Sequence, residues 1–355
     1  MTLQRQMMFW LAALGVLIVA LWLLSEVLLP FVAGMALAYL LHPITRRVER
    51  LGLGRTASAL VVVVLVLVLL VLLVMLIAPI LFAQLAAFID NLPGYVAKLQ
   101  ALVSDPSRPW LAKIFGERMS DPGKPMGDLV TQGARWLAVF LGSLWSGGKT
   151  LVSVFSLLVI TPVVAFYLLC DWERMIAAVD GWVPLPQRET VRALAREIDD
   201  AIAAFVRGQA GICLILGAYY AVGLTLTGLN FGFLIGFATG IASFIPYVGW
   251  LTGFVAAGAV AIAQFWPSMT PIIVVLAIFL VGTVLENYVL APTFVGAKIG
   301  LHPVWLIFAL LAFGYLFGFV GLLIAIPLAA AVGVLMRFAL RRYLASSLYT
   351  GEGPR

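Results

Sequence analysis

The sequence predicts an all-α integral membrane protein with about eight transmembrane helices, some broken or re-entrant, and one extramembrane insertion. Hydrophobic residues make up 63% of the 355 positions and charged residues only 11%, whereas soluble globular domains hold roughly 45–50% and 25%. Between residues 208 and 285 there is no Asp, Glu, Lys, Arg or His. A bilayer accommodates such a stretch as successive helical spans of about 20 residues. The composition therefore predicts the lipid bilayer as the surroundings of this chain.

Residues 1–82 are expected to form the N-terminal transmembrane helices. Residues 7–41 are almost entirely apolar, with Pro30 near the middle. As one helix they would reach about 52 Å, well beyond a hydrocarbon core of about 30 Å. Two short spans that meet near Glu26 and Pro30 fit better, and the Val- and Leu-rich residues 56–82 predict a third span.

The middle of the chain changes character twice. Residues 83–148 contain five prolines and mixed charges, which predicts an extramembrane, periplasmic insertion. Residues 149–170 predict a further span, kinked at Thr161–Pro162. Residues 171–207 are polar again and are expected to form a cytoplasmic amphipathic segment. Its apolar residues recur at helical spacing, which fits an interfacial helix or a helix packed on its own protein.

Residues 208–336 are expected to form the C-terminal transmembrane core. Residues 209–227 and 271–290 each predict one span. Residues 231–265 and 304–336 would each be about 50 Å long as one helix, and each is interrupted by proline and glycine. They are either re-entrant hairpins or kinked single spans. Gly232, Gly236 and Gly240 follow a GxxxGxxxG pattern, which lets helices approach closely. Packing within one protomer is the simpler interpretation, and a homo-oligomer remains possible.

The arginines indicate the topology, because cytoplasmic loops carry an excess of Lys and Arg. Clusters follow the apolar segments at residues 46–55 and 337–342. We therefore expect the 46–55 loop, residues 171–207 and the tail 337–355 in the cytoplasm, together with the N-terminus. The net charge of +6 reflects this placement, and no nucleic-acid partner is expected.

Glu286 is the strongest candidate for chemistry within the apolar segments. A carboxylate at membrane depth costs several kcal/mol unless it is paired, hydrated or protonated, and such residues mark ion or proton pathways. A carboxylate solvated at headgroup level is the alternative. Glu286, Asn287 and Tyr288 are therefore candidate ion- or substrate-binding residues.

The interruption at residues 245–249 is the second candidate. Breaking a helix in lipid frees backbone groups, and transporters use such breaks to hold ions and polar substrates. Pro246, Tyr247 and Gly249 are the candidate residues, and a purely structural kink is the alternative. Arg207, Gln209 and Asp171 stand at span ends, where they would line a cytoplasmic vestibule or simply reach the interface.

Enzymatic and metal chemistry is not indicated. The chain contains no HExxH, GxSxG or Walker A motif, so neither an enzyme nor a nucleotide-driven pump is expected. The two cysteines and two histidines are too scattered for a metal site, and no cofactor is implied. The energy for transport would then come from an ion gradient or a partner.

Several motifs together resemble the autoinducer-2 exporter (AI-2E) family of bacterial permeases. They are Pro30-Phe31 with Ala38-Tyr39-Leu40-Leu41-His42-Pro43, Thr161-Pro162 with Phe166-Tyr167-Leu168-Leu169, Arg207-Gly208-Gln209, Ile245-Pro246-Tyr247-Val248-Gly249, Glu286-Asn287-Tyr288-Val289-Leu290-Ala291-Pro292, Gly300-Leu301-His302-Pro303, and Gly318, Gly321 and Pro327-Leu328. They occur in the family's order and leave only residues 83–148 poorly matched. The resemblance implies a multi-pass protein of the bacterial inner membrane. It also implies export of small molecules such as autoinducer-2, although some relatives look like sodium/proton antiporters.

These observations lead to the hypothesis of ion-coupled secondary transport. Glu286 would bind the coupling H⁺ or Na⁺ with help from Asn287, and the break near Tyr247 would contribute to the site of a small-molecule substrate. The first alternative is cation/proton antiport without an organic substrate. The second is a membrane scaffold or assembly protein with no transport cycle.

Overall fold

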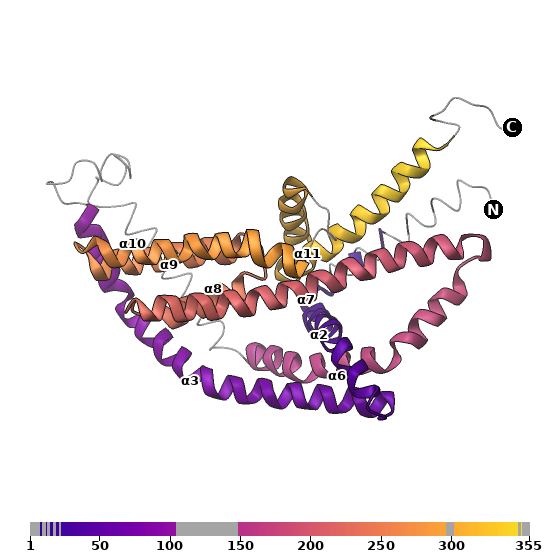
Figure 1. Ribbon diagram of the computed structural model, residues 1–355, viewed down its shortest axis with the longest axis horizontal. Helices are drawn as coiled ribbons and strands as arrows, with labels where there is room; N and C mark the ends of the chain where they lie inside the picture. The colour runs from indigo at the N-terminus through magenta and orange to yellow at the C-terminus, as the bar shows by residue number, and fades with distance from the viewer. Residues whose placement is uncertain are drawn as a thin grey trace. The chain divides into compact units, whose positions relative to one another are not determined.

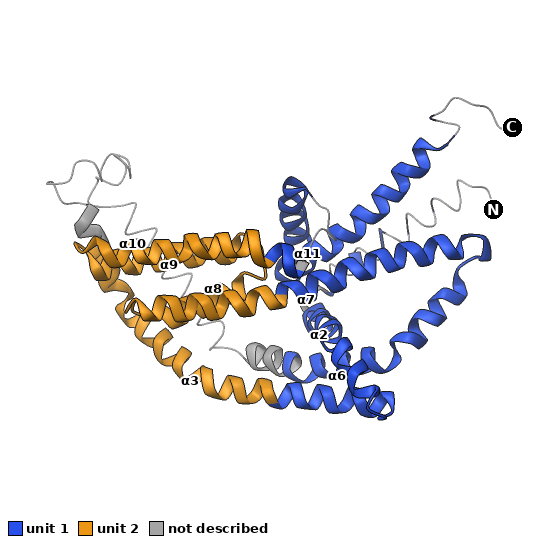
Figure 2. Cartoon of the chain, viewed as in Figure 1, with its two compact units in different colours: residues 1–68, 155–209, 291–355 blue, residues 69–154, 210–290 orange. Residues whose placement is uncertain are grey.

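A computed structural model describes residues 23–103, 148–295 and 302–346, with a few single residues outside these ranges. Within the described ranges all regular structure is helical and there is no strand (Figure 1). The chain divides into two compact units (Figure 2). Unit 1 comprises Met1–Val68, Phe155–Gln209 and Ala291–Arg355, and unit 2 comprises Leu69–Val154 and Ala210–Leu290. The predicted all-α class is confirmed.

The structure describes ten helical elements in chain order. They are α2 (Ser25–Glu49), α3 (Arg55–Val103), α6 (Gly148–Trp182), the 3₁₀ turn η2 (Leu185–Gln187), α7 (Arg188–Leu226), α8 (Gly232–Ala242), α9 (Val248–Phe265), α10 (Met269–Val284), the π-helical segment η3 (Leu285–Val295) and α11 (Pro303–Leu344). In the described part of the chain, six helical segments are long and apolar enough to cross a membrane, compared with about eight predicted crossings. Most of the first predicted span lies outside the described residues, and α6, which contains the predicted span 149–170, is not among the six. The 11 residues of α8 reach only about 16 Å.

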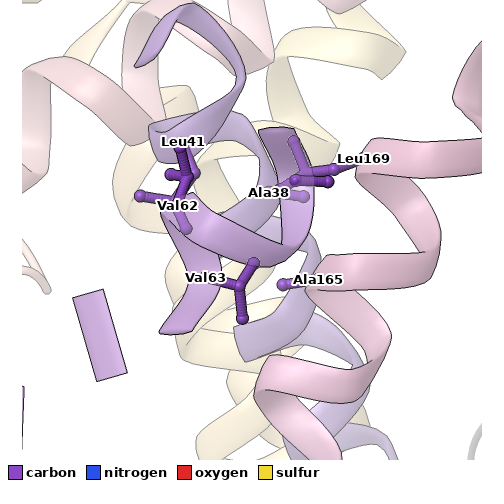
Figure 3. Packing of buried hydrophobic residues seen from close by; sticks show 7 residues of the cluster. Ala38, Leu41, Val62, Val63, Ala165 and Leu169 are labelled. Atoms are coloured by element: carbon purple, nitrogen blue, oxygen red, sulfur yellow. The ribbon is translucent and has the colours of Figure 1, made fainter. Parts of the chain in front are cut away.

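The core of unit 1 forms where α2, the first turns of α3 and α6 meet. Its buried residues are Ala38, Leu41, Ala59, Val62, Val63, Ala165 and Leu169 (Figure 3). Three of the seven are alanines, and Gly34 of α2 packs directly on Val164 of α6. Small residues at these contacts let the helix backbones approach closely. This close packing fixes the position of Tyr39, the neighbour of Ala38 on α2.

Two helices run through boundaries that the sequence had suggested. The helix α3 continues without a break past residue 82 to Val103, so the start of the predicted insertion does not coincide with a helix end. Residues 104–147 lie outside the described part of the chain, and the membrane position of residues 83–103 stays a prediction. The helix α7 likewise joins residues 188–207 to residues 208–226. Its exposed first turns give way to buried residues from Ala201 onward, so this half of the amphipathic segment packs on its own protein.

Unit 2 is built around close backbone contacts between α7 and α8. The backbone of Gly232 lies against Leu224, that of Gly236 against Tyr220 and Ala221, and that of Gly240 against Gly217. The predicted glycine pattern therefore packs two helices of the same chain. The second half of α3 adds a polar contact at the start of α8, where the Gln84 side chain accepts a hydrogen bond from the Leu234 amide at 2.9 Å.

The structure distinguishes between the two interpretations of residues 231–265. They form a helical hairpin, in which α8 ends at Ala242 and α9 begins at Val248. Gly249 and Gly253 of α9 pack on Ser243 and Thr239 of α8. The segment is thus two antiparallel helices. The other long segment, in α11, is broken at Gly318, whose φ of 59° and ψ of −137° lie outside the helical region, and its two parts point in different directions (Figure 1).

Candidate functional site

Glu286 stands where the α-helical winding of α10 changes to the π-helical winding of η3. Such π-helical turns are rare and occur frequently at functional sites. The Glu286 side chain is half-buried. Its carboxylate is close enough to the Cys213 thiol and the Tyr220 hydroxyl, both on α7, for electrostatic interaction. Glu286 is therefore directed toward α7 in unit 2, and its side chain is only partly exposed.

Tyr220 supplies a polar group beside Glu286 that the sequence did not indicate. Its side chain is fully buried and stacks on Phe279 with ring centroids 4.8 Å apart. Its hydroxyl lies against the backbone of Gly282, one turn before Glu286. Among the described residues this hydroxyl has no hydrogen-bond partner. A buried hydroxyl without a partner costs about 1–3 kcal/mol, so the structure contains a polar atom available to an ion, a water or a solute.

The break between α8 and α9 lies near the same stretch of α7. Gly240, three residues before Ser243, packs on Gly217 and on the carbonyl of Cys213, the residue that also interacts with Glu286. The break residue Tyr247 has a positive φ of 67°, a conformation that non-glycine residues rarely adopt. Sparsely populated backbone conformations cluster at ligand sites and switch regions. The last turn of α8, which precedes the break, and Glu286 therefore both lie near Cys213 of α7.

The other candidates near these positions are more exposed. The Asn287 side chain donates a hydrogen bond to the Thr283 carbonyl of the preceding turn at 2.9 Å. Tyr288 is 78% exposed and Tyr247 57% exposed. Pro246 is half-buried and Gly249 is buried against Ser243. The predicted assistance of Asn287 to Glu286, and the binding roles of Tyr247 and Tyr288, therefore stay predictions.

Arg207 belongs to a second candidate site, in unit 1. Pro43 lies four residues after Tyr39 within α2, and a proline has no N–H to bond the carbonyl four residues earlier. The Arg207 Nε donates a hydrogen bond to this Tyr39 carbonyl at 3.0 Å. The Tyr39 hydroxyl in turn donates to Asp199 Oδ1 at 2.7 Å. One tyrosine of α2 is thus held at both ends by charged residues of α7.

Tyr39, Asp199 and Arg207 line a cavity of about 60 Å³ that opens to the outside of unit 1. A cavity needs roughly 10–15 Å³ of such space per water, so this one holds about four to six non-hydrogen atoms. Its polar lining is Tyr39, His42, Asp199 and Arg207, and the ring of Trp172 closes one side. The Trp172 and Tyr39 rings meet edge to face with centroids 6.0 Å apart. The cavity therefore combines a cation, an anion and an aromatic wall in a small volume.

The remaining vestibule candidates, Asp171 and Gln209, do not line this cavity. Asp171 accepts a hydrogen bond from Arg174 at 3.4 Å on an exposed helix surface. Gln209 is buried and does not line the cavity. In the part of the chain that the structure describes, no group of three or more His, Cys, Asp or Glu side chains could hold a metal ion.

An ion-pair cluster lies beside the cavity. The Arg55 guanidinium contacts Glu173 at 2.7 Å and also donates to the Leu169 carbonyl at 3.1 Å. Arg46 approaches the same carboxylate at 3.7 Å. The hydrogen bond and positive charge of Arg55 hold the pKa of Glu173 below its ordinary value. Glu173 therefore compensates part of the positive charge that surrounds His42.

The sequence interpretation missed Tyr39, Asp199 and Trp172 as members of one site. A signal was available for Tyr39, because a proline four residues later in a helix leaves a carbonyl without its intrahelical donor. No local pattern connects Tyr39 with Asp199, since 160 residues separate them. Tyr220 was equally hidden, because nothing in the sequence shows that its hydroxyl is buried.

Comparison with known proteins identifies the family. The model of the AI-2E family transporter matches residues 11–341. The chain belongs to the AI-2E transporter family. It is 28% identical over 324 residues to YrrI of Bacillus subtilis (strain 168), provisionally named a transport protein, and the match covers 90% of this chain and 89% of YrrI. It is also 28% identical over 315 residues to PerM of Escherichia coli (strain K12), provisionally named a permease, with 87% and 86% covered.

A third relative, YueF of Bacillus subtilis (strain 168), is 27% identical over 311 residues, covering 87% of this chain and 83% of YueF. It too is provisionally named a transport protein. Membership in the AI-2E family, together with the apolar helices of the described ranges, makes the chain a multi-pass membrane protein with a role in transport. A transporter family implies a non-enzymatic role, and the relatives compared are bacterial.

Proposed function

We propose that the protein is a secondary transporter that exports small molecules, an autoinducer-2-like signal or a related metabolite, driven by a proton or sodium gradient across the bacterial inner membrane. The observation that carries this proposal is Glu286, a half-buried carboxylate beside the buried hydroxyl of Tyr220 in a helical unit dominated by apolar residues. An ionisable side chain in such surroundings is typical of an ion or proton pathway.

Glu286 would hold the coupling ion. With a proton bound, the side chain is neutral and its burial costs far less than that of a carboxylate. With Na⁺ bound, the carboxylate and the Tyr220 hydroxyl offer oxygen ligands, which hard cations prefer. In either case the ion cancels a charge that would otherwise oppose burial. Ion binding is thereby linked to the conformation of η3, where Glu286 stands.

The α8–α9 hairpin would contribute to the substrate path. The amides of Phe244, Ile245 and Val248 are hydrogen-bonded within the turn, so these three N–H groups are not available to a substrate. Such helix breaks near polar sites hold ions and small substrates in other transporters. Pro246, Tyr247 and Gly249 would shape this turn, and the cavity beside Arg207 would serve as the cytoplasmic vestibule.

Cation/proton antiport is the second candidate function, because a carboxylate that exchanges H⁺ for Na⁺ needs no organic substrate. A non-transporting scaffold is the third. It predicts that Glu286 can be neutralised without loss of function.

The test is flux in proteoliposomes under imposed proton and sodium gradients, with and without autoinducer-2 inside. Wild type is compared with Glu286→Gln, which keeps the shape but removes the charge. Glu189→Gln, in the exposed first turn of α7, is the matched control. We expect gradient-dependent flux that falls at least about tenfold in Glu286→Gln, equivalent to 1.4 kcal/mol, and is unchanged in Glu189→Gln.

The species that moves separates the candidates. Efflux of autoinducer-2 supports the exporter, whereas sodium and proton exchange alone supports the antiporter. If folded wild type and folded Glu286→Gln both remain at the empty-liposome level, ion-coupled transport of these substrates is refuted.

A further inference from the structure

We propose that the unit 1 cavity between Tyr39, Trp172, Asp199 and Arg207 binds small zwitterionic solutes that carry one carboxylate and one ammonium group. As a transport site the cavity depends on the proposed function, but as a binding site it can be tested without any flux.

The two charged residues of the cavity bind opposite ends of one residue, Tyr39. Arg207 bonds the backbone carbonyl of Tyr39, and Asp199 accepts from the hydroxyl at the tip of the same residue. No ion pair of 4.0 Å or less joins Arg207 and Asp199 in the described part of the chain. The tyrosine therefore holds a cation and an anion apart, both beside the same cavity.

Each charged group keeps hydrogen-bonding capacity for a ligand. Arg207 uses its Nε for Tyr39, which leaves the two terminal nitrogens of the guanidinium. Such a planar fork suits a carboxylate. Asp199 uses Oδ1 for the Tyr39 hydroxyl, which leaves Oδ2 as an acceptor for an ammonium group. In the described part of the chain no further hydrogen bond occupies these atoms.

The shape and walls of the cavity fit the same ligand class. Its volume of about 60 Å³ suits roughly four to six non-hydrogen atoms, the size of glycine or alanine. The ring of Trp172 forms a wall on which an ammonium group gains cation–π attraction. Met35 and Leu168 add apolar lining for a short aliphatic side chain.

Charge balance excludes simple ions. A carboxylate without an ammonium group would be repelled by Asp199, and an amine without a carboxylate would be repelled by Arg207. Glu173 pairs with both Arg46 and Arg55 and offsets one of their two positive charges. Neither arginine lines the cavity, so the charges that a ligand contacts there are those of Arg207 and Asp199. Only a ligand that carries both charges satisfies both ends, because specificity rests on the repulsion of the alternatives.

The experiment measures thermal stability of the detergent-purified full-length protein with increasing L-alanine, propionate or ethylamine. Propionate and ethylamine present the two charges of the amino acid one at a time. We expect a saturable rise in Tm with alanine, and an affinity at least about tenfold weaker for either single ion. A response to alanine no larger than the responses to propionate and ethylamine would overturn the proposal.

Two variants test the roles of the charges. Asp199→Asn keeps an acceptor for Tyr39 and removes the negative charge, so it should lose alanine selectivity and respond to propionate instead. Arg207→Gln should respond to ethylamine instead. Arg174→Gln is the matched control, because Arg174 is 88% exposed, pairs with Asp171 and does not line the cavity, and it should respond like wild type. Arg207→Gln also removes the bond to Tyr39, so Asp199→Asn carries the test if that variant does not fold.

The outcomes separate this proposal from the transport proposal. Alanine binding that persists without any flux refutes transport of these solutes while the site stands. Flux that depends on Glu286, without alanine-specific stabilisation, refutes the site while transport stands. An unaltered alanine response in folded Asp199→Asn also refutes the site.

Discussion

The two halves of α7 are joined to their neighbours in opposite ways. In unit 2, residues 217–225 contact α8 through backbone at Gly232, Gly236 and Gly240. In unit 1, residues 199–207 are tied to α2 through side-chain hydrogen bonds, from Tyr39 to Asp199 and from Arg207 to the Tyr39 carbonyl. One helix therefore carries a close-packed, charge-free contact and a polar contact that depends on a few bonds.

The difference follows from the solvent that each half is expected to meet. Within lipid there is no hydrophobic force between helices, so close van der Waals packing of small residues has to hold them together. Near water, charged side chains can be solvated and can exchange partners. Backbone packing tolerates little change in distance, whereas side-chain bonds can break and re-form. We therefore expect unit 2 to hold the ion site rigidly and the polar contact of unit 1 to respond to solutes.

The largest expected effect comes from adding one methyl group to the close-packed contact. A Cβ at Gly236 would collide with the backbone of Tyr220 and Ala221. Gly236→Ala should therefore destabilise the protein by about 3 kcal/mol or more, since overpacking against backbone cannot be relieved by a rotamer change. The measurement is thermal unfolding in detergent.

Gly258→Ala is the control, because nothing lies within 4 Å of a Cβ at that position. It should leave the Tm unchanged or slightly raised. Equal effects of the two substitutions would contradict the assignment of Gly236 as a backbone contact.

The next effect addresses the polar contact of unit 1. Arg207→Gln removes the donor to the Tyr39 carbonyl, which Pro43 has deprived of its helical partner. We expect a cost of about 1–3 kcal/mol. In a Pro43→Ala background the helix can bond this carbonyl itself, so the cost of Arg207→Gln should fall by about 1 kcal/mol.

The measurement is a double-mutant cycle of urea or thermal unfolding in detergent. Additive effects of Pro43→Ala and Arg207→Gln would show that the arginine does not act through the freed carbonyl.

A smaller effect is expected for the buried hydroxyl of unit 2. Tyr220→Phe removes an oxygen that has no hydrogen-bond partner among the described residues, so stability should stay within about 0.5 kcal/mol of wild type or rise. If the hydroxyl assists the ion at Glu286, the ion concentration for half-maximal flux should rise several-fold. Tyr219→Phe is the comparison, since its hydroxyl bonds the Ile278 carbonyl at 3.0 Å and its loss should lower stability without changing ion dependence. A large loss of stability in Tyr220→Phe would mean that the Tyr220 hydroxyl forms a hydrogen bond in the membrane-embedded protein, and it would contradict the assignment of this hydroxyl as unpartnered.

The smallest effect concerns pH and unit 1. The hydrogen bond from Arg55 lowers the pKa of Glu173 in the folded protein, so the ionised form is favoured by folding. Its contribution to stability is present above the unfolded pKa of about 4.3 and is lost as the pH falls through the lower folded pKa. Because the Glu173 side chain is 62% exposed, solvent screening keeps the contribution below about 1 kcal/mol.

Comparing the Tm of wild type and Glu173→Gln from pH 7 to pH 3.5 tests this. The difference between the two proteins should shrink toward the acid end, and a constant difference would exclude the ion pair as its cause.

Much of the architecture followed from local patterns. The charge-free stretch predicted membrane helices, the glycine spacing predicted a close contact, and the proline–glycine interruption located the break that separates α8 from α9. The choice between a hairpin and a kinked span could not be made from the sequence, because both use the same residues and differ only in where α9 packs. Of the candidate site residues, Glu286 could be predicted from the sequence because it is a charged residue in an apolar run. Tyr220 and Asp199 could not be predicted, because nothing in the local sequence distinguishes them from other tyrosines and aspartates.

The amino-acid sequence by itself determined membrane residence, helical class and the position of Glu286, because the cost of charge in hydrocarbon acts residue by residue. Only the tertiary structure decided that Pro43, Tyr39, Asp199 and Arg207 form one site and that Tyr220 stands beside Glu286. These relations arise when segments more than 60 residues apart in the chain pack together. Which side chain satisfies a freed carbonyl, and which hydroxyl is left without a partner, depends on that packing.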